Sequence, residues 1–214
     1  MFSDRADAGR QLASRLQHLA EEHPVVLALP RGGVVVGAEI ARELHAPLDV
    51  LVVRKLGAPY QPELAIGAII DGNPPRKVLN EDLIATLSVS EDYIDREAEK
   101  QLAQARRRQQ AYRSGAPAVA IDDRTALVVD DGVATGATVK AALAALRHAP
   151  AARLVLAVPV GAPQAMDRLR PEVDELVCLH SPWTFQAVGA FYSRFTQTTD
   201  DEVITLLAES RGTR

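Results

Sequence analysis

The chain has 214 residues, of which 47 % are hydrophobic and 24 % are charged, and these proportions exclude a disordered or fibrous protein. A formal charge of −4 offers no general attraction for nucleic acid or an anionic membrane, so we expect neither as a partner, and the basic run Arg106–Arg108 is typical of a solvated helix face. The single cysteine, Cys178, excludes a disulfide framework within the chain, and no apolar stretch approaches the roughly 18 residues that span a membrane. We therefore expect a cytoplasmic protein.

Short apolar runs alternate with helical patterns along most of the chain. The runs lack polar alternation, as strands buried on both faces of a parallel sheet do, and they are Val25–Leu29, Leu48–Val53, Leu64–Ile70, Ala126–Val129, Leu154–Val160 and Glu175–Leu179. Helices are predicted at Asp4–Glu22, Val34–Leu44, Val139–Arg147, Ala165–Leu169 and Asp201–Glu209. The sequence therefore predicts a single α/β domain, with a mostly parallel twisted sheet between two layers of helices.

Residues 71–124 break this alternation. They begin with a Gly- and Pro-containing turn at 71–75 and continue through a short strand at Lys77–Leu79 into a polar helix over Ser90–Tyr112. Ser88 and Glu91 have the spacing of a capping box at the start of that helix. We interpret 71–124 as a helical insertion in the α/β domain.

The most informative stretch follows this insertion. An apolar strand is followed by two adjacent acids, Asp130 and Asp131, and then by a loop that leads into a helix. In an open α/β sheet, ligands bind at the carboxyl ends of the strands, where both acids are expected. Backbone N–H groups, a helix N-terminus and two hydroxyls make the loop suitable for a phosphate. Its residues are Ala134, Thr135, Gly136, Ala137 and Thr138.

The two acids indicate which kind of phosphate compound fits. Carboxylates beside a phosphate repel it unless they face hydrogen-bond donors on the same ligand, such as vicinal ribose hydroxyls. A pentose 5-phosphate satisfies both halves of the pattern. The sequence has no Gly-Lys-Ser/Thr after the loop, no dinucleotide fingerprint around Gly32–Gly37 and no nucleophile elbow. The alternative interpretation of 130–132 is a strand-ending turn without a ligand.

This stretch resembles the signature of the type I phosphoribosyltransferases: an apolar strand, two acids, two or three small or apolar residues, and Thr-Gly-x-Thr. Val128–Thr138 matches it except at Gly132, where the family usually has an aliphatic residue or serine, and we expect this glycine to loosen the turn. The order of the other elements extends the resemblance over most of residues 24–182. It implies a three-layer type I fold with five or six strands, one of them antiparallel, and a small hood.

The resemblance also implies an activity, which is transfer of the 5-phosphoribosyl group from phosphoribosyl diphosphate to a nitrogenous base, with release of diphosphate. Asp130 and Asp131 would hold the ribose 2- and 3-hydroxyls and favour the positive charge that develops on the ribose, while 134–138 would grip the 5-phosphate. Mg²⁺ would be bound mainly through the donor, with no protein metal site. Some proteins of this fold bind the same donor as regulators with little or no catalysis, and this is the alternative function.

Two further segments match places where family members contact the diphosphate. The first follows the first strand and contains Pro30, Arg31, Gly32 and Gly33. Its glycines let backbone N–H groups approach an anion closely, and its arginine adds charge-assisted hydrogen bonds. The second is Arg54 and Lys55, and we predict that Lys55 is a catalytic residue that stabilises the leaving diphosphate. The alternative is an ordinary strand-to-helix turn for the first segment and a solvated strand terminus for the second.

The family commonly covers the acceptor base with a hood built from the chain ends. We expect the hood in residues 180–214 together with the N-terminal segment, with Trp183 and Phe185 as candidate acceptor-binding residues because a flat heterocycle stacks on aromatic rings. Glu63 is a third candidate, and it could instead orient Lys55 or assist Mg²⁺. Relatives that use 6-oxopurines commonly have an aspartate where this chain has Ala134, so hypoxanthine and guanine are expected to be poor acceptors. A homodimer is the candidate assembly.

Overall fold

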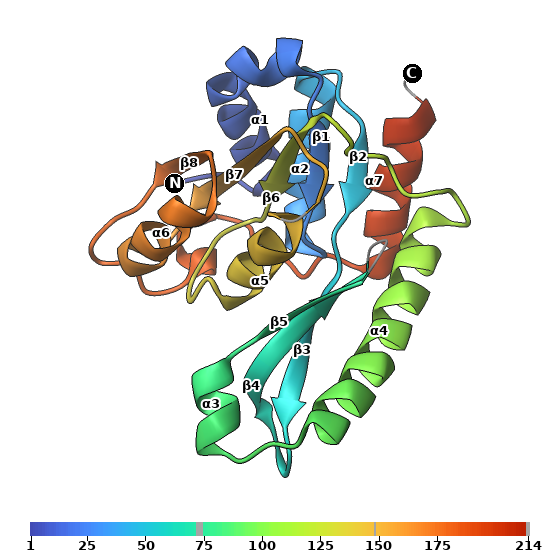
Figure 1. The fold of residues 1–214 in the computed structure, drawn as a ribbon. Helices are drawn as coiled ribbons and strands as arrows, with labels where there is room; N and C mark the ends of the chain where they lie inside the picture. The colour runs from blue at the N-terminus through green and yellow to red at the C-terminus, as the bar shows by residue number, and fades with distance from the viewer. Residues whose placement is uncertain (72–74, 148, 213–214) are drawn as a thin grey trace.

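The computed structural model describes residues 1–71, 75–147 and 149–212, and it contains a main sheet with helices on both faces and a smaller lobe below it (Figure 1). The main sheet has the strand order β2-β1-β6-β7-β8, and every pairing in it is parallel. Its strands are β1 (Val25–Ala28), β2 (Leu48–Val50), β6 (Thr125–Val129), β7 (Arg153–Val160) and β8 (Glu175–His180).

Helices cover both faces of the main sheet, which confirms the predicted three-layer α/β fold. One layer contains α1 (Arg5–Arg15), α2 (Gly32–Glu43) and α7 (Asp200–Gly212), and the other contains α5 (Ala137–Leu146) and α6 (Pro163–Leu169). Val26 and Ala28 of β1 pack toward the first layer, whereas Val25 and Leu27 pack toward the second. Successive side chains of a strand point to opposite faces, so a strand covered on both faces has to be apolar throughout.

The smaller lobe is built on an antiparallel sheet of order β3-β4-β5. Its elements are β3 (Val53–Ala58), β4 (Gln61–Ile70), β5 (Arg76–Leu79), α3 (Glu81–Thr86) and α4 (Glu91–Arg113). Leu56, Ile66 and Ile69 of the sheet form a separate apolar cluster with Ile94 and Ala98 of α4. The long helix α4 continues from this lobe to the main sheet, where it packs against α7 and β2 (Figure 1).

The smaller lobe corrects two strand predictions. The run Leu48–Val53 is not one strand, because the chain leaves the main sheet after Val50 and starts β3 at Val53. The run Leu64–Ile70 belongs to the second sheet. The antiparallel strand that was expected in the main sheet is therefore part of the smaller lobe instead. The physical reason is the two-residue turn between Ala58 and Gln61, which are paired with each other, since so short a connection permits only antiparallel pairing.

Several element boundaries also differ from the expectations. The helix expected over Asp4–Glu22 ends at Arg15, and a 3₁₀ segment, η1 (Gln17–Glu22), follows it and keeps Leu19 buried. The cap of α4 is Ser90, whose hydroxyl accepts a hydrogen bond from the N–H of Tyr93, rather than Ser88. Two shorter 3₁₀ segments are η2 (Arg170–Glu172) and η3 (Val188–Phe191). The turn expected at 71–75 lies largely outside the described residues.

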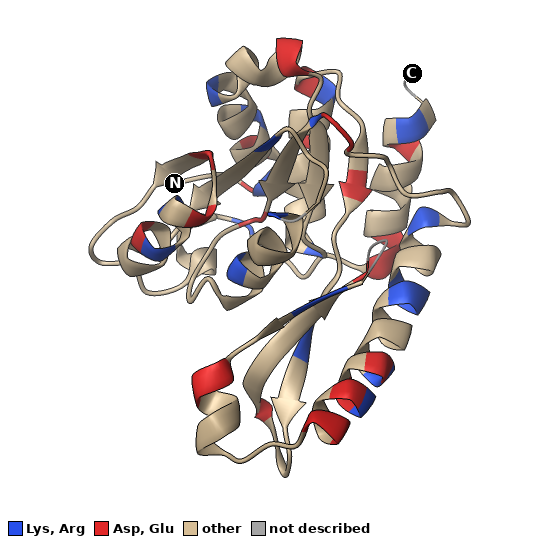
Figure 2. Cartoon of the chain, in the orientation of Figure 1, with Lys and Arg blue, Asp and Glu red and all other residues tan. Residues whose placement is uncertain are grey.

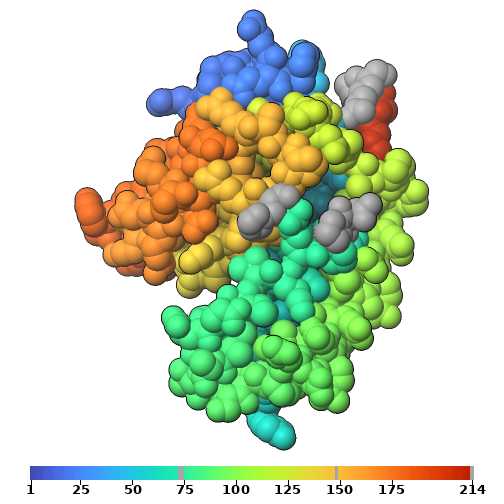
Figure 3. All heavy atoms as spheres, in the orientation of Figure 1, coloured from blue at the N-terminus to red at the C-terminus, as the bar shows by residue number. Residues whose placement is uncertain are grey.

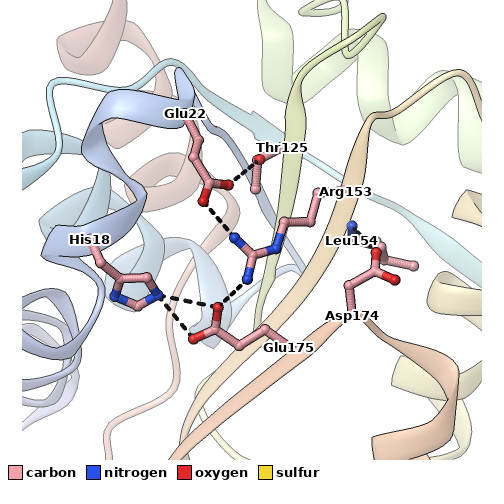
Figure 4. Close-up of polar contacts among 7 residues, drawn as sticks. All are labelled: His18, Glu22, Thr125, Arg153, Leu154, Asp174 and Glu175. Carbon is pink, nitrogen blue, oxygen red and sulfur yellow. Dashed lines mark hydrogen bonds and ion pairs between the residues drawn. The ribbon is translucent and has the colours of Figure 1, made fainter.

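A polar network closes the amino ends of the central strands (Figure 4). Arg153, the first residue of β7, donates hydrogen bonds to Glu22 at 2.5 Å and to Glu175 at 2.7 Å. Glu22 also accepts from the hydroxyl of Thr125 at 2.7 Å, and the ring of His18 lies 3.0 Å from Glu175. The network ties η1 to β6, β7 and β8, so the side chains at this end of the sheet are engaged with one another.

Charged side chains on α4 are distributed along its length (Figure 2). Acids lie in its first turn and a basic residue in its last, which suits the helix dipole. In the basic run, Arg106 pairs with Asp71 at 2.9 Å and Arg108 lies 3.3 Å from Asp200, so two of its charges have partners within the chain. No helix in the described part of the chain combines the length and the apolar character that a membrane crossing requires.

Candidate functional site

The centre of the main sheet contains a topological switch point. β1 and β6 are neighbours, and the chain leads from β1 outward to β2 on one side and from β6 outward to β7 on the other. Ala28 and Val129 are in register, and the N–H of Leu29 donates to the carbonyl of Val129 at 2.8 Å. The loops after β1 and β6 therefore start side by side, at the place where open α/β sheets bind ligands.

The two loops touch through the glycines of the first and the acids of the second. A Cβ atom added to Gly32 would lie 1.9 Å from Oδ2 of Asp131, and one added to Gly33 would lie 3.0 Å from Cα of Asp130. Side chains at these positions would therefore push the loops apart. The structure brings together the predicted segments 30–33 and 130–131. The peptide bond between Pro30 and Arg31 is cis.

The two acids have different surroundings. Oδ1 of Asp130 accepts a hydrogen bond from the N–H of Asp131 at 2.8 Å, and burial together with the neighbouring carboxylate raises the pKa of Asp130 well above its ordinary value. Oδ2 of Asp131 is held by Nε of Arg5 at 2.6 Å, and these two side chains are only 16 % and 11 % exposed. Both acids are half-buried, and they differ in their partners: Asp130 accepts from the neighbouring backbone, whereas Asp131 forms an ion pair with Arg5.

The predicted phosphate loop leads directly into α5. The side chains of Ala134, Thr135, Ala137 and Thr138 are exposed, so the loop is open to a ligand. The hydroxyl of Thr135 accepts from the N–H of Ala137 at 3.4 Å, and Arg168 of α6 donates to the carbonyl of Thr135 at 3.3 Å. A helix N-terminus with a cation beside it favours an anion.

Arg54 and Lys55 are held by the smaller lobe. The guanidinium of Arg54 donates to Gln101 at 3.0 Å and to Gln104 at 2.5 Å, both on α4. Nζ of Lys55 lies 3.0 Å from Oε2 of Glu63, across the hairpin of β3 and β4. Glu63 therefore contacts Lys55, as the alternative role of orienting this lysine requires.

A cavity of 380 Å³ separates these cations from the phosphate loop. Arg54 and Lys55 line it on the side of the smaller lobe, and Ala137 and Thr138 line it at the start of α5. A second hollow of 470 Å³ adjoins it between β4, β5 and α5, with Lys140 on its wall. Figure 3 shows a notch where the green smaller lobe meets the yellow surface of α5. The two predicted segments therefore face each other across a space that a ligand can occupy.

Arg31 is turned toward the C-terminal helix. Its Nη1 lies 3.9 Å from Oδ1 of Asp200, the first residue of α7. The same carboxylate accepts from the hydroxyl of Tyr112 at 2.6 Å and from Arg108 at 3.3 Å. The hydrogen bond from Tyr112 and the charge of Arg108 hold the pKa of Asp200 below its ordinary value. Arg31 is not among the residues that line the cavity shared by Arg54 and Lys55.

Residues 181–195 lie over the carboxyl ends of β6 and β7. The hydroxyl of buried Tyr192 donates to the carbonyl of Asp131 at 2.5 Å, and Phe2 pairs with Tyr192 through an isolated bridge. Phe185 stacks on Phe191 at 5.7 Å between ring centroids, and Trp183 is 87 % exposed. The N-terminal and C-terminal segments therefore meet beside the acid pair.

The candidate acceptor residues are not gathered into one place. Glu63 lies on β4, near the tip of the hairpin in the smaller lobe, whereas Trp183 and Phe185 follow β8 in the main part of the fold (Figure 1). Residues 200–212 of the expected hood form α7, which packs against α2 and α4. Of the expected hood, only the segment before α7 and the N-terminus lie near the acids.

Gly132 has a packing role that differs from the one expected. A Cβ at this position would lie 2.5 Å from Cγ1 of Val188 and 2.9 Å from Cγ1 of Val160. The glycine lets the segment around Val188 pack closely against the turn. A larger aliphatic residue here would displace that segment.

Several contacting residues have no signal in the sequence. Arg5 and Asp131 are 126 positions apart, and Arg168, Tyr192 and Asp200 also reach the site residues from distant elements. Arg5, Arg168 and Asp200 look like ordinary surface residues in their own segments, whereas Tyr192 belongs to the cluster of aromatic residues after β8 that marks this region in the sequence. Cys178 is partly buried against the α5 and α6 layer, and this burial raises the pKa of its thiol to about 11.

The fold and this geometry define an α/β domain with an acid pair, and an exposed loop that leads into a helix, at the switch point of a parallel sheet. A family model described as "Phosphoribosyl transferase domain" matches residues 4–192, so the chain belongs to this family. The resemblance found in the sequence is confirmed.

Two sets of relatives extend this result. Proteins from two strains of Mycobacterium tuberculosis, both named "Putative phosphoribosyl transferase", are 50 % identical over 207 residues. The match covers 97 % of this chain and 46 % of those proteins, so the chain spans about half their length. The crystal structure of TT1426 from Thermus thermophilus is 44 % identical, with a TM-score of 0.86 and coverage of 98 % of each chain.

Proposed function

We propose that this chain transfers the 5-phosphoribosyl group from phosphoribosyl diphosphate to a nitrogenous base and releases diphosphate. The observation that carries the proposal is the acid pair Asp130–Asp131 beside the open loop 134–138, at the switch point of the sheet. The family supports phosphoribosyl transfer in general. The geometry supports the proposal with a candidate position for each part of the donor.

The ribose and its phosphate would occupy the end of β6. Asp130 and Asp131 would take the ribose hydroxyls, and the backbone N–H groups of 134–138 with the N-terminus of α5 would take the 5-phosphate. A nitrogen lone pair of the base forms the new bond to the anomeric carbon. The bond between that carbon and the diphosphate oxygen breaks, and the electron pair of the broken bond leaves with diphosphate. Carboxylates fixed beside the ribose favour the positive charge that develops on it.

The diphosphate would leave through a region rich in cations. Lys55 and Arg54 face the phosphate loop across the cavity, and Arg31 with Gly32 and Gly33 forms the loop beside the acids. Negative charge increases on the diphosphate as it departs, so cations in fixed positions stabilise the transition state more than the bound donor. Lys55 is the catalytic residue in this proposal, and Glu63 orients it.

The acid pair also fits Mg²⁺, because carboxylate oxygens are the hard ligands that this ion prefers. Within the described ranges, no three His, Cys, Asp or Glu side chains gather into a metal site. In this proposal Mg²⁺ would bind mainly through oxygens of the donor. When bound, the ion neutralises part of the charge on the diphosphate.

The acceptor base would lie between the acid pair and the aromatic segment 181–195. This segment, with Phe2, is our proposed hood, because its Tyr192 contacts Asp131 directly. Phe185 and exposed Trp183 are the aromatic rings that it offers to a planar base.

A product scan tests the proposed function. The protein is incubated with phosphoribosyl diphosphate, Mg²⁺ and a panel of purine, pyrimidine and other nitrogenous bases, and the products are identified by mass spectrometry. We expect a nucleoside 5-monophosphate from at least one base, together with diphosphate, and none from Asp130→Asn/Asp131→Asn. A protein that binds the donor and converts none of the bases is instead a regulator that senses phosphoribosyl diphosphate.

A further inference from the structure

Arg5 reaches the acid pair from the other end of the chain. Its Nε lies 2.6 Å from Oδ2 of Asp131, and its Nη1 donates to the carbonyl of Thr196 at 2.7 Å. The guanidinium also lies 3.8 Å from the centroid of the Phe195 ring, in a cation–π contact. These contacts come from the loop after β6 and from the C-terminal segment, which supplies both a carbonyl and an aromatic face, so they fix the plane of the guanidinium.

The same guanidinium touches the loop after β1. A Cβ on Gly32 would lie 2.7 Å from Nε of Arg5, so the glycine leaves just enough room for the arginine. Tyr192 holds the backbone carbonyl of Asp131 while Arg5 holds its carboxylate. Both the main chain and the side chain of Asp131 are therefore positioned by residues from the two ends of the chain.

Charge gives Arg5 a second effect on the pair. Burial and the charge of Asp131 raise the pKa of Asp130, and the charge of Arg5 acts in the opposite direction. One guanidinium beside two acids balances one carboxylate charge. Because the Arg5 and Asp131 side chains are mostly buried, water screens this interaction weakly.

We infer that Arg5 is a positioning residue of the donor site, which holds the carboxylate of Asp131 in the orientation that accepts a hydrogen bond from a ribose hydroxyl. The inference rests on the proposed function, because it requires Asp131 to bind the ribose. Arg5 acts through Asp131 and needs no contact with the reacting atoms.

A comparison of two ligands separates this role from general attraction for phosphate. Calorimetry measures binding of ribose 5-phosphate and of 2,3-dideoxyribose 5-phosphate to the wild type and to Arg5→Met. A lost positive charge weakens both ligands alike, whereas a misplaced Asp131 weakens only the ligand with hydroxyls. We expect the wild type to prefer ribose 5-phosphate about tenfold or more, and Arg5→Met to retain a preference of about threefold or less.

Arg10→Met is the matched control, since it removes the same charge from the same helix. Arg10 is 53 % exposed and lies 3.8 Å from Glu39, away from the acid pair, so this variant should keep the full preference. If Arg5→Met unfolds, Phe195→Leu replaces it, because this change removes the aromatic face and leaves the charge. We expect Phe195→Leu to reduce the preference about threefold.

The outcomes distinguish this inference from the proposed function. A wild type that prefers the hydroxyls, with both Arg5→Met and Phe195→Leu unchanged in preference, overturns the role of Arg5 and leaves the ribose site standing. Tighter binding of ribose 5-phosphate by Arg5→Met also overturns it, because Arg5 would then be occupying the place of the ribose. A wild type without any preference removes the ribose assignment itself, and the inference with it.

Discussion

The hydroxyl of Tyr112 donates a 2.6 Å hydrogen bond to the carboxylate of Asp200, which joins α4 to the first turn of α7. Tyr112 is buried, and Arg31 and Arg108 approach the same carboxylate. Through this contact, a helix that begins in the smaller lobe and a helix near the chain terminus both reach the arginine of the loop after β1. The position of Arg31 therefore depends on two elements far from it in sequence.

Replacing Tyr112 with phenylalanine removes this hydrogen bond and keeps the ring in the core. We expect Tyr112→Phe to lower the free energy of unfolding by about 1–2 kcal/mol, measured by urea denaturation at pH 7. The pKa of Asp200 is held below its ordinary 3.8, so the contribution is present above that pH and fades as the folded carboxylate becomes protonated at lower pH. Tyr60→Phe is the control, because Tyr60 is fully exposed at a hairpin tip. Equal loss in both variants would contradict the assignment.

Burial of Asp130 should make the protein less stable as the pH rises. Its pKa is raised in the folded state, so the unfolded chain loses the proton first, and stability falls as the pH rises from about 4 through the folded pKa. Asp130→Asn stays neutral and should therefore raise Tm at pH 7 by at least about 2–4 °C, which corresponds to about 1 kcal/mol. Thermal melts at several pH values measure this. The gain should vanish near pH 4, and a gain independent of pH would show that burial of the charge is not its cause.

Lys55 should contribute more to the reaction than to donor binding. If its charge stabilises the departing diphosphate, Lys55→Ala lowers kcat at least about tenfold, or about 1.4 kcal/mol of transition-state stabilisation, with a smaller effect on the Kd of the donor. Steady-state kinetics and calorimetry supply the two values. Lys77→Ala is the matched control, because Lys77 is a lysine of the same small sheet whose ion pair is with Asp95. Loss of affinity alone in Lys55→Ala would assign Lys55 to binding.

The residue at position 134 bears on the choice of acceptor. An alanine can neither protonate nor hydrogen-bond the ring of a 6-oxopurine, so kcat/KM for hypoxanthine and guanine should fall well below that for the best base in the panel. Competition between bases, followed by mass spectrometry of the nucleotides, measures the ratio directly. Efficient turnover of either 6-oxopurine would show that another residue makes this contact.

The sequence was sufficient for the parts of the fold that depend on local pattern. Uninterrupted apolar runs predict strands such as β6 and β7 because both faces of those strands are covered. The pattern failed at Leu48–Val53 and Leu64–Ile70, where equally apolar residues serve two different sheets. Apolar character reports burial, whereas the partner of a strand also depends on its connections, such as the two-residue turn that joins β3 to β4.

The candidate site could likewise be predicted only where its residues are contiguous in sequence. The acid pair and the loop after it are contiguous in sequence, and so they can be identified from their order alone. The cavity between Lys55 and Thr138 and the ion pair between Arg5 and Asp131 join segments that are far apart in sequence. No local sequence pattern around Lys55 or Arg5 specifies the distant segment that it meets, so these two relationships emerge only from the packed structure.

The most direct test of the proposed donor site is calorimetric titration of the wild type and of Asp130→Asn/Asp131→Asn with phosphoribosyl diphosphate in the presence of Mg²⁺. The double variant keeps the volume of both side chains, and circular dichroism and thermal melts establish that it is folded. We expect binding by the wild type and a loss of at least about tenfold in affinity in the folded variant, because the ribose hydroxyls lose charged acceptors. Unchanged affinity in the folded double variant would contradict the assignment of this acid pair to the donor.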